Sequence, residues 1–346
     1  MTWVAIWQNG GMCPTPGTGA RAIAPDREHE ALTLWLEMRM PTPGRRPLRI
    51  WRGSGGCARD CALLLMPDGA LRLRMDEMDL FTPPGFFSGG HMMVLRLVLC
   101  ARGRRDMVDI LNVTSAERHM ARLGLAWPAR LRDLWPAEHG YTRLACVAGL
   151  ATMALPATDL PGIEAGARIL TEAGPTPVER LSVGDRVIGR DGRAHPVCWI
   201  AARDRLCLGH AAPILMRAPY FGLDRDICVT PQTRILRSGP DVEYLTGQDE
   251  VLLRAGDLVS DHAARIDRTQ AVRRFYHLML DDPDCLAIGR CRIETATLSE
   301  VVAAEEAPGG VAMLVPRDGQ TSRLLLDRAG TRALLGTSAT GHGALI

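Results

Sequence analysis

Cysteine and histidine are the residues of this chain best suited to chemistry, because thiolates act as nucleophiles and both side chains bind metals. The sequence has ten cysteines and nine histidines. Its 41 basic residues are all arginine, which excludes Schiff-base catalysis and a P-loop lysine. Cys57 and Cys61 are the closest cysteine pair, and no second pair stands at zinc-finger spacing. We therefore predict no metal site, no cofactor and no disulfide scaffold.

Apolar and polar residues alternate through much of residues 30–112, which is typical of half-buried strands. Turn-forming residues such as Pro41–Gly44 and Pro67–Gly69 separate these segments, and the whole predicts a β-sandwich. The outline resembles the concanavalin-like and laminin-G-like jelly rolls. Such sandwiches often bind sugars, but the sequence has no Asp/Asn cluster that would build a calcium site, so a docking or structural module is favoured and glycan binding is the alternative. The residues expected on inner faces are Leu32, Leu34, Leu36, Met38, Met40, Leu71, Leu73, Met93, Leu95, Leu97 and Leu99.

The character of the sequence changes at about residue 113. We predict a short helix over Ala116–Leu125, with Thr114 or Ser115 as its N-cap. Prolines then interrupt the chain, so we assign residues 1–140 to the sandwich domain and 141–161 to a linker.

A second all-β domain is predicted from Gly162 to about residue 300, because short β-branched runs alternate there with Gly, Pro and Asp-Gly breaks. Residues 301–346 form a tail with one helical candidate, Thr321–Leu335. The fold class expected for the whole chain is therefore all-β, a jelly-roll-like sandwich followed by a second β-fold.

Motif segments follow one another through this second domain. They are Gly162–Thr171, Pro177–Val187 with its V-x-x-L-x-x-G-D-x-V pattern, Pro196–Ile200, Ala212–Arg217, Asp226–Leu236, Glu250–Val259 and Tyr276–Asp281. In this order they resemble the Hint domain, the β-fold shared by inteins and hedgehog autoprocessing domains, and its bacterial branch most of all. The resemblance covers residues 162–300.

The resemblance implies a self-cleaving mechanism. In the family, a Cys or Ser at the first position attacks the carbonyl before it and converts the peptide bond to a thioester or ester. A T-x-x-H element orients the amide and protonates its nitrogen, and such acid catalysis is typically worth about 10²–10⁴-fold. Here Gly162 stands at the nucleophile position and Thr233 at the histidine position, while Thr230 retains the orienting hydroxyl. Pro283 stands where the family often has a later histidine.

Several other side chains are candidates for the missing nucleophile and proton donor. Cys146 precedes Gly162 by too many residues for a local acyl shift. Cys198, Cys207 and Cys228 lie in or near predicted strands, where thiols are usually buried and inert. The family often has a histidine at the place of His277, which is either structural or catalytic. Asp281 is either a remnant of the site or a turn residue. His195 and His210 fall near predicted turns and are expected to be solvated.

The net charge and the apolar content of the chain limit the kinds of partner and location to expect. The net charge is +2, so charge gives no case for nucleic-acid binding. No stretch has the roughly 20 apolar residues of a membrane span, and the first residues lack the pattern of a secretory signal. We expect a cytoplasmic protein, with signal-independent export as the alternative.

Together these residues predict a Hint-like domain that has lost self-cleavage and acts as a scaffold or binding module for an unknown protein or glycan. Two alternatives stay open. One is an active autoprocessing protein that cleaves near Pro161–Gly162 with water or an outside thiol. The other is a glycan-binding sandwich.

Overall fold

The computed structural model describes residues 3–9, 11–13, 27–53, 61–75, 78–101, 106–124, 129–134, 145–156, 159–260, 262–282, 284–304 and 323–340. The chain divides into two compact units. The first comprises residues 1–155 with 208–210, and the second comprises 156–207 with 211–346. Pro283 and Cys57 lie outside the described residues.

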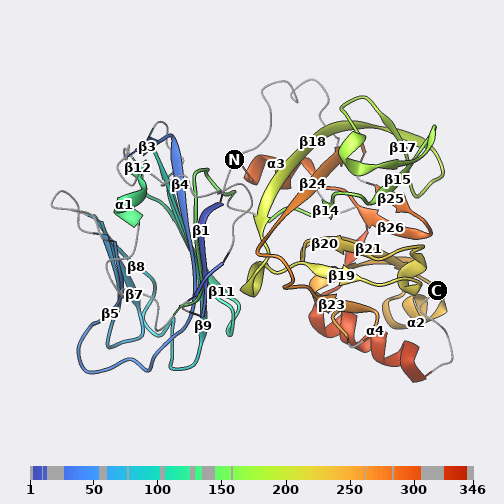
Figure 1. The fold of residues 1–346 in the computed structure, drawn as a ribbon. Coiled ribbons are helices and arrows are strands. Elements are labelled where there is room, and N and C mark those ends of the chain that lie inside the picture. Colours follow the sequence, from blue (N-terminus) through green and yellow to red (C-terminus); the bar gives the residue numbers. More distant parts are fainter. Residues whose placement is uncertain are drawn as a thin grey trace. The chain divides into compact units, whose positions relative to one another are not determined.

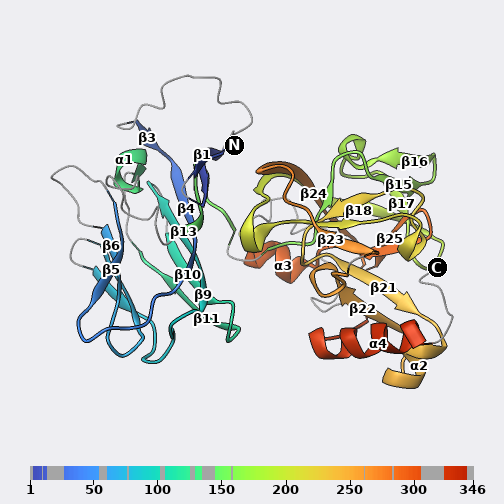
Figure 2. The same ribbon diagram turned by 60° about the horizontal axis from the view of Figure 1, so that its bottom comes forward.

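The first unit contains a seven-stranded antiparallel sheet in the order β11-β10-β9-β4-β13-β1-β2. Its strands are β1 (Trp3–Gln8), β2 (Gly11–Met12), β4 (Ala31–Arg39), β9 (Met92–Cys100), β10 (Met107–Asn112), β11 (Glu117–Arg122) and β13 (Ala145–Ala151). A four-stranded sheet in the order β5-β6-β7-β8 packs against it, as Figures 1 and 2 show. These strands are β5 (Leu48–Arg52), β6 (Cys61–Leu65), β7 (Leu71–Met75) and β8 (Met78–Phe81). Beside them lie β3 (Glu28–His29), β12 (Ala129–Arg130) and α1 (Leu131–Leu134).

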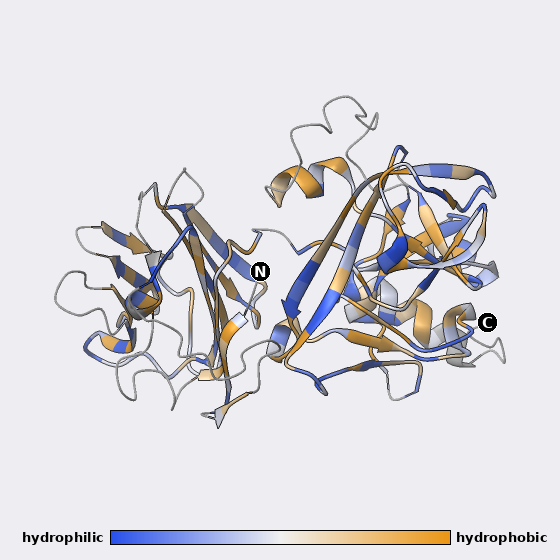
Figure 3. Cartoon of the chain, turned by 45° about the horizontal axis from the view of Figure 1, so that its top comes forward, coloured by the Kyte–Doolittle hydropathy of each residue, from blue (hydrophilic) through white to orange (hydrophobic). Residues whose placement is uncertain are grey.

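One core joins the two sheets, so the first unit is a β-sandwich, as the alternating pattern predicted. Leu34 and Leu36 of β4 pack in the same cluster as Leu63 of β6 and Leu73 of β7. Figure 3 shows the alternation of hydrophobic and hydrophilic residues along several strands. The all-β fold class is confirmed.

The predicted helix over Ala116–Leu125 is wrong, because Glu117–Arg122 forms the strand β11 and pairs with β10. Asn112 Oδ1 accepts hydrogen bonds from the backbone N–H groups of Thr114 and Ser115, at 3.1 and 3.3 Å, so its side chain organises a hairpin turn. Arg118 then forms a bidentate pair with Asp109 across the strands. The segment 145–151, assigned to the linker, is β13 and lies between β1 and β4.

The second unit is built on a nine-stranded sheet in the order β16-β15-β17-β18-β24-β14-β20-β19-β23. Its strands are β14 (Ile163–Glu164), β15 (Arg168–Thr171), β16 (Gly174–Pro177), β17 (Arg186–Ile188), β18 (Ala194–Leu206), β19 (Ile214–Met216), β20 (Ile227–Val229), β23 (Ala264–Ile266) and β24 (Val272–Leu280). A five-stranded sheet in the order β25-β26-β21-β22-β27 completes the unit. Its strands are β21 (Arg234–Ser238), β22 (Glu250–Arg254), β25 (Cys285–Ile288), β26 (Cys291–Glu294) and β27 (Leu324–Leu325).

In the described part of the second unit the helices are short. They are α2 (Pro240–Thr246), α3 (Leu298–Ala303) and α4 (Arg328–Thr340), with the 3-10 turns η1 (Val178–Arg180), η2 (Gly209–Ala211), η3 (Tyr220–Gly222) and η4 (Ala255–Asp257), of which η2 spans the unit boundary. The tail helix begins later than predicted, because β27 occupies Leu324–Leu325 and Asp327 accepts a hydrogen bond from the Gly330 N–H at 2.7 Å. Among the described residues, no helix has the length and apolar character needed to cross a membrane.

Candidate functional site around the Pro161–Gly162 bond

The peptide bond between Pro161 and Gly162 leads directly into β14, in the interior of the nine-stranded sheet (Figure 1). Ile163 of β14 pairs with Tyr276 of β24 on one side and with Val229 of β20 on the other. His277 is the next residue on β24, and Thr230 is the first residue after β20. This register therefore places both of them beside the start of β14. The sheet therefore brings three distant segments of the chain to one bond.

Carbonyl groups on both sides of the bond accept hydrogen bonds from buried side chains. His277 Nδ1 lies 2.7 Å from the Pro161 carbonyl oxygen. The Thr230 hydroxyl donates to the Leu160 carbonyl at 3.0 Å, and the Thr230 backbone N–H donates to the Gly162 carbonyl at 2.9 Å. Thr230 and His277 are both buried, so water does not compete for these bonds.

Thr233 takes the amide side of the same bond. The Gly162 N–H donates to the Thr233 hydroxyl oxygen at 3.1 Å. That hydroxyl also lies 3.0 Å from the Gly162 carbonyl and 3.0 Å from the Thr230 hydroxyl, and its single proton goes to one of them. The nitrogen that would have to leave is thus bound to a hydroxyl that does not titrate near neutrality.

His277 is held neutral. Its burial, followed by the charge of Arg205, lowers the pKa of His277 to about 3. A carbonyl only accepts, so Nδ1 carries the proton and donates it to Pro161. Nε2 is then an acceptor, and it is buried without a hydrogen-bond partner in the described part of the chain. At neutral pH His277 can polarise a carbonyl, but it cannot supply a proton as an imidazolium.

Gly162 has no space for a side chain. A Cβ atom at this position would lie 2.6 Å from His277 Cε1, 2.8 Å from His277 Nδ1 and 3.0 Å from Thr230 Cγ2. Such distances are too short for carbon contacts, so the imidazole ring occupies the place where a nucleophile would begin. Close approach, and not an unusual φ angle, is what requires glycine here.

Asp281 lies with a different histidine. Its Oδ1 is 3.4 Å from His195 Nδ1, while His195 Nε2 is 3.1 Å from Asp191 Oδ1 and 3.9 Å from Asp284 Oδ2. Burial lowers the pKa of His195, but the hydrogen bond and charge of Asp191 and the charge of Asp281 outweigh it and leave the pKa raised. His195 was expected to be solvated near a turn. Instead it lies in β18 with its side chain 15% exposed.

Three donor atoms of this second group, from Asp191, His195 and Asp284, lie within 4.8 Å of one another, as metal ligands would. Asp284 is already engaged, because its Oδ2 accepts from the Arg190 backbone N–H at 2.7 Å and its Oδ1 lies 3.5 Å from Arg323 Nη1. Both carboxylate oxygens of Asp284 therefore already have partners within the chain.

The three cysteines in or near the predicted strands are poor replacement nucleophiles. Cys198, Cys207 and Cys228 are buried, as expected from their predicted strands. Burial raises the pKa of Cys207 to about 12 and also raises the pKa values of Cys198 and Cys228, so all three remain thiols at neutral pH.

Sequence reasoning missed the support behind Thr233. Arg234 is buried, and its guanidinium pairs with Glu294 and with Glu300, whose Oε1 lies 2.5 Å from Nη1. Arg234 Nη2 also donates to the Thr295 carbonyl at 3.0 Å. These bonds fix the start of β21 directly after Thr233. Arginine and glutamate are common on surfaces, so their spacing carried no signal of a buried network.

Comparison with known proteins places a family model, described as the Hint domain, on residues 161–300. No curated protein matches the chain. Among solved structures, an intein-like domain from Clostridium thermocellum is 13% identical, with a TM-score of 0.29, and covers 40% of this chain and 100% of that one. The MchDnaB-1 intein is 14% identical, with a TM-score of 0.27, and covers 38% of this chain and 98% of that one. A scytalido-glutamic peptidase is 12% identical, with a TM-score of 0.24, and covers 36% and 60%. Similarities this low carry no inference about activity.

Proposed function

We propose, from the premise that residues 161–300 of this chain belong to the Hint domain family, that the domain keeps its Pro161–Gly162 bond intact and serves as a scaffold or binding module. The observation that carries the proposal is the lack of room for a side chain at Gly162. The residue lacks a nucleophilic side chain, and the His277 ring fills the volume in which one would stand.

Acyl-shift chemistry needs three things at this bond: a nucleophile, a proton for the departing nitrogen, and access to the carbonyl carbon. Gly162 supplies no nucleophile. Thr233 accepts a hydrogen bond from the amide nitrogen and has no ionisable proton near neutrality. The His277 ring covers the space beside Gly162, and its low pKa keeps it neutral near pH 7, so it cannot act as an imidazolium acid.

The same contacts support a structural role. Leu160, Pro161 and Gly162 each have a carbonyl bound by Thr230 or His277, so the entry to β14 is fixed on both sides. Buried hydrogen bonds of this kind contribute about 1 kcal/mol each, and losing one partner costs more because the other is left unsatisfied. We therefore infer that these hydrogen bonds hold residues 160–162 in place at the point where the chain enters the domain.

The decisive experiment is the intact mass of the freshly purified full chain, recorded under denaturing conditions with and without dithiothreitol. We expect one species with the mass of the uncut chain in both samples. Two fragments that meet between residues 161 and 162 would overturn the proposal. Fragments that form only with dithiothreitol would assign the cleavage to an outside thiol.

The active alternative has one favourable observation, the 2.7 Å contact of His277 Nδ1 with the Pro161 carbonyl. A donor there would stabilise the oxyanion formed by attacking water or thiolate. If fragments are found, H277A should slow their formation, whereas H195A, which removes a histidine from the separate acidic group, should not. Glycan binding by the first unit stays a prediction, and a glycan array probed with the full chain tests it.

A further inference from the structure

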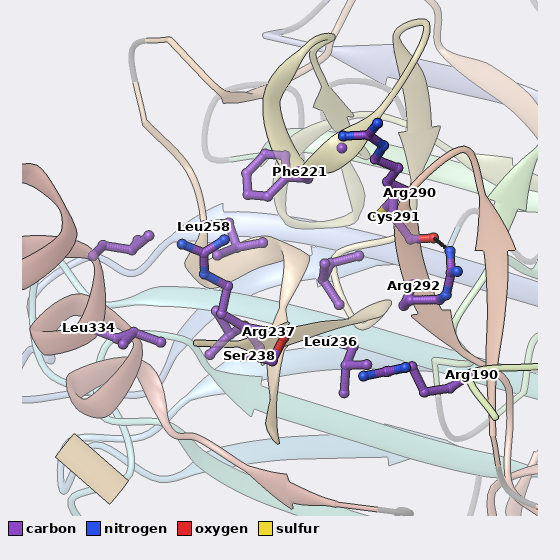
Figure 4. Close-up of a pocket in the computed structure, with 14 residues that line it drawn as sticks. Arg190, Phe221, Leu236, Arg237, Ser238, Leu258, Arg290, Cys291, Arg292 and Leu334 are labelled. Atoms are coloured by element: carbon purple, nitrogen blue, oxygen red, sulfur yellow. Dashed lines mark hydrogen bonds between the residues drawn. The ribbon is translucent and has the colours of Figure 1, made fainter. Parts of the chain in front are cut away.

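A cavity of about 330 Å³ lies in the second unit, walled by β21, β26, η3 and the helix α4 (Figure 4). None of its lining residues takes part in the site at Pro161–Gly162. Its volume is within the range of about 300–1,000 Å³ that is usual for pockets binding small organic ligands. The cavity is therefore a candidate binding site of its own.

Among the residues that the structure describes, four arginines and no acidic side chain line this cavity, although the whole chain is close to neutral. Arg190 follows β17, Arg237 lies on β21, Arg290 is in the turn between β25 and β26, and Arg292 lies on β26. Figure 4 shows that they reach the cavity from separate elements. The fold thus concentrates positive charge that is dispersed in the sequence.

Two of these arginines are already engaged. Arg190 Nε donates to Glu250 Oε1 at 2.7 Å. Arg292 Nη1 lies 3.2 Å from the carbonyl oxygens of Gly289 and Cys291. Over the residues that the structure describes, Arg237 and Arg290 have no carboxylate within ion-pair distance. Their guanidinium groups are available to an anion.

Apolar side chains form much of the remaining wall. Phe221, Leu258 and Leu334 line it, with Leu258 and Leu334 buried. Phe221 has a φ of 60°, which is uncommon for a bulky residue and costs about 1–3 kcal/mol. The neighbouring turn holds it in place, since the Arg290 N–H donates to the Gly222 carbonyl at 2.8 Å. Arg290 and Phe221 are thereby fixed on adjoining turns.

We propose that this cavity binds a small organic anion, with its carboxylate or phosphate group among the arginines and its apolar part against Phe221, Leu258 and Leu334. Guanidinium groups bind both kinds of oxyanion through paired N–H donors. A bare inorganic ion would leave most of the volume empty, because one water takes up only about 30 Å³ of liquid. The inference goes beyond the proposed function and does not depend on whether the Pro161–Gly162 bond is cut.

The first test uses the full chain and the fluorescent anion anilinonaphthalene sulfonate, titrated to saturation. The R237Q/R290Q variant should bind it about ten- to a hundredfold more weakly, because each charged hydrogen bond lost costs roughly one decade of affinity. The matched control is R180Q/R268Q, which removes the same charge from two exposed arginines of the same unit outside the cavity. Equal weakening in both variants, or none in either, would overturn the proposal.

The second test needs no variant and therefore does not depend on how well one folds. Octanoate, octyl phosphate and octanol compete for the bound probe on the unmodified chain. Displacement by one or both anions at concentrations at least tenfold below octanol supports the proposal and identifies the preferred acid group. Octanol as effective as the anions would show a site without charge recognition, and the absence of saturable probe binding would show no site; either result overturns it.

Discussion

Two histidines of the second unit, His277 and His195, lie in opposite surroundings. His277 is 1% exposed, has no carboxylate among its hydrogen-bond partners and has a lowered pKa. His195 is partly exposed among Asp191, Asp281 and Asp284, and its pKa is raised. One ring therefore acts as a neutral donor that fixes the backbone, whereas the acidic neighbours of the other favour its protonated form. The comparison shows that neighbours, and not residue type, decide what a histidine does.

The largest expected effect comes from H277A. It removes a buried ring and leaves the Pro161 carbonyl without its donor, so we expect the free energy of unfolding of the second unit to fall by about 3 kcal/mol. Hydrogen exchange of β14 and β24 amides at neutral pH measures it. H195A is the matched control and should cost less than about 1 kcal/mol. Equal losses in the two variants would erase the contrast between the histidines.

Acid should weaken the second unit through His277. Its pKa is about 3 in the folded chain and about 6.5 in the unfolded chain. Between these values the unfolded state binds more protons, so stability falls as the pH drops below about 6.5. The loss from this residue should reach about 2 kcal/mol near pH 5. Unfolding of H277Q, followed over the same pH range, should lack this component, and an unchanged acid slope would contradict it.

G162A tests the crowding beside His277. The new methyl group would overlap the ring, and we expect a loss of about 2 kcal/mol at neutral pH. In the H277A background the same substitution should cost much less, because the ring is gone. The control is G336A on α4, where the added group would meet nothing within 4 Å apart from the helix's own nearby backbone and where alanine should stabilise by about 0.5–1 kcal/mol. Additive losses for Gly162 and His277 would argue against the close contact.

The smallest effect belongs to His195. Its raised folded pKa means that its stabilisation is complete below its unfolded pKa and is lost as the pH rises through the folded value. H195Q should therefore cost about 0.5 kcal/mol near pH 5 and almost nothing near pH 9. Thermal unfolding at the two pH values measures the difference, and a larger cost at the alkaline value would reverse the assignment.

Local motifs predicted much of the second fold. The Gly-Asp pair is an example, because Gly184 has a φ of 96° and Asp185 Oδ2 accepts from the Ser182 N–H at 2.8 Å. Turn chemistry of this kind is readable from neighbouring residues. The false helix at 116–125 arose where Thr114 and Ser115 look like N-caps, whereas Asn112 binds their N–H groups and closes a hairpin.

The candidate site was predictable in part. The position of Gly162 relative to Thr230 and Thr233 follows from the motif order. The resemblance placed His277 near this site, but not its ring in the space beside Gly162. That detail depends on the register of β14 against β24, more than one hundred positions apart in sequence. The arginine-lined cavity left no sequence signal at all, because its four arginines come from separate elements.

The contact between Gly162 and the His277 ring also limits what this position can accept. A side chain introduced at position 162 would have to displace the ring or shift the backbone, so a nucleophile cannot be added there without disturbing the packing. Under the proposed function, self-cleavage would need a nucleophile at position 162, room beside it and a proton donor at position 233 all at once.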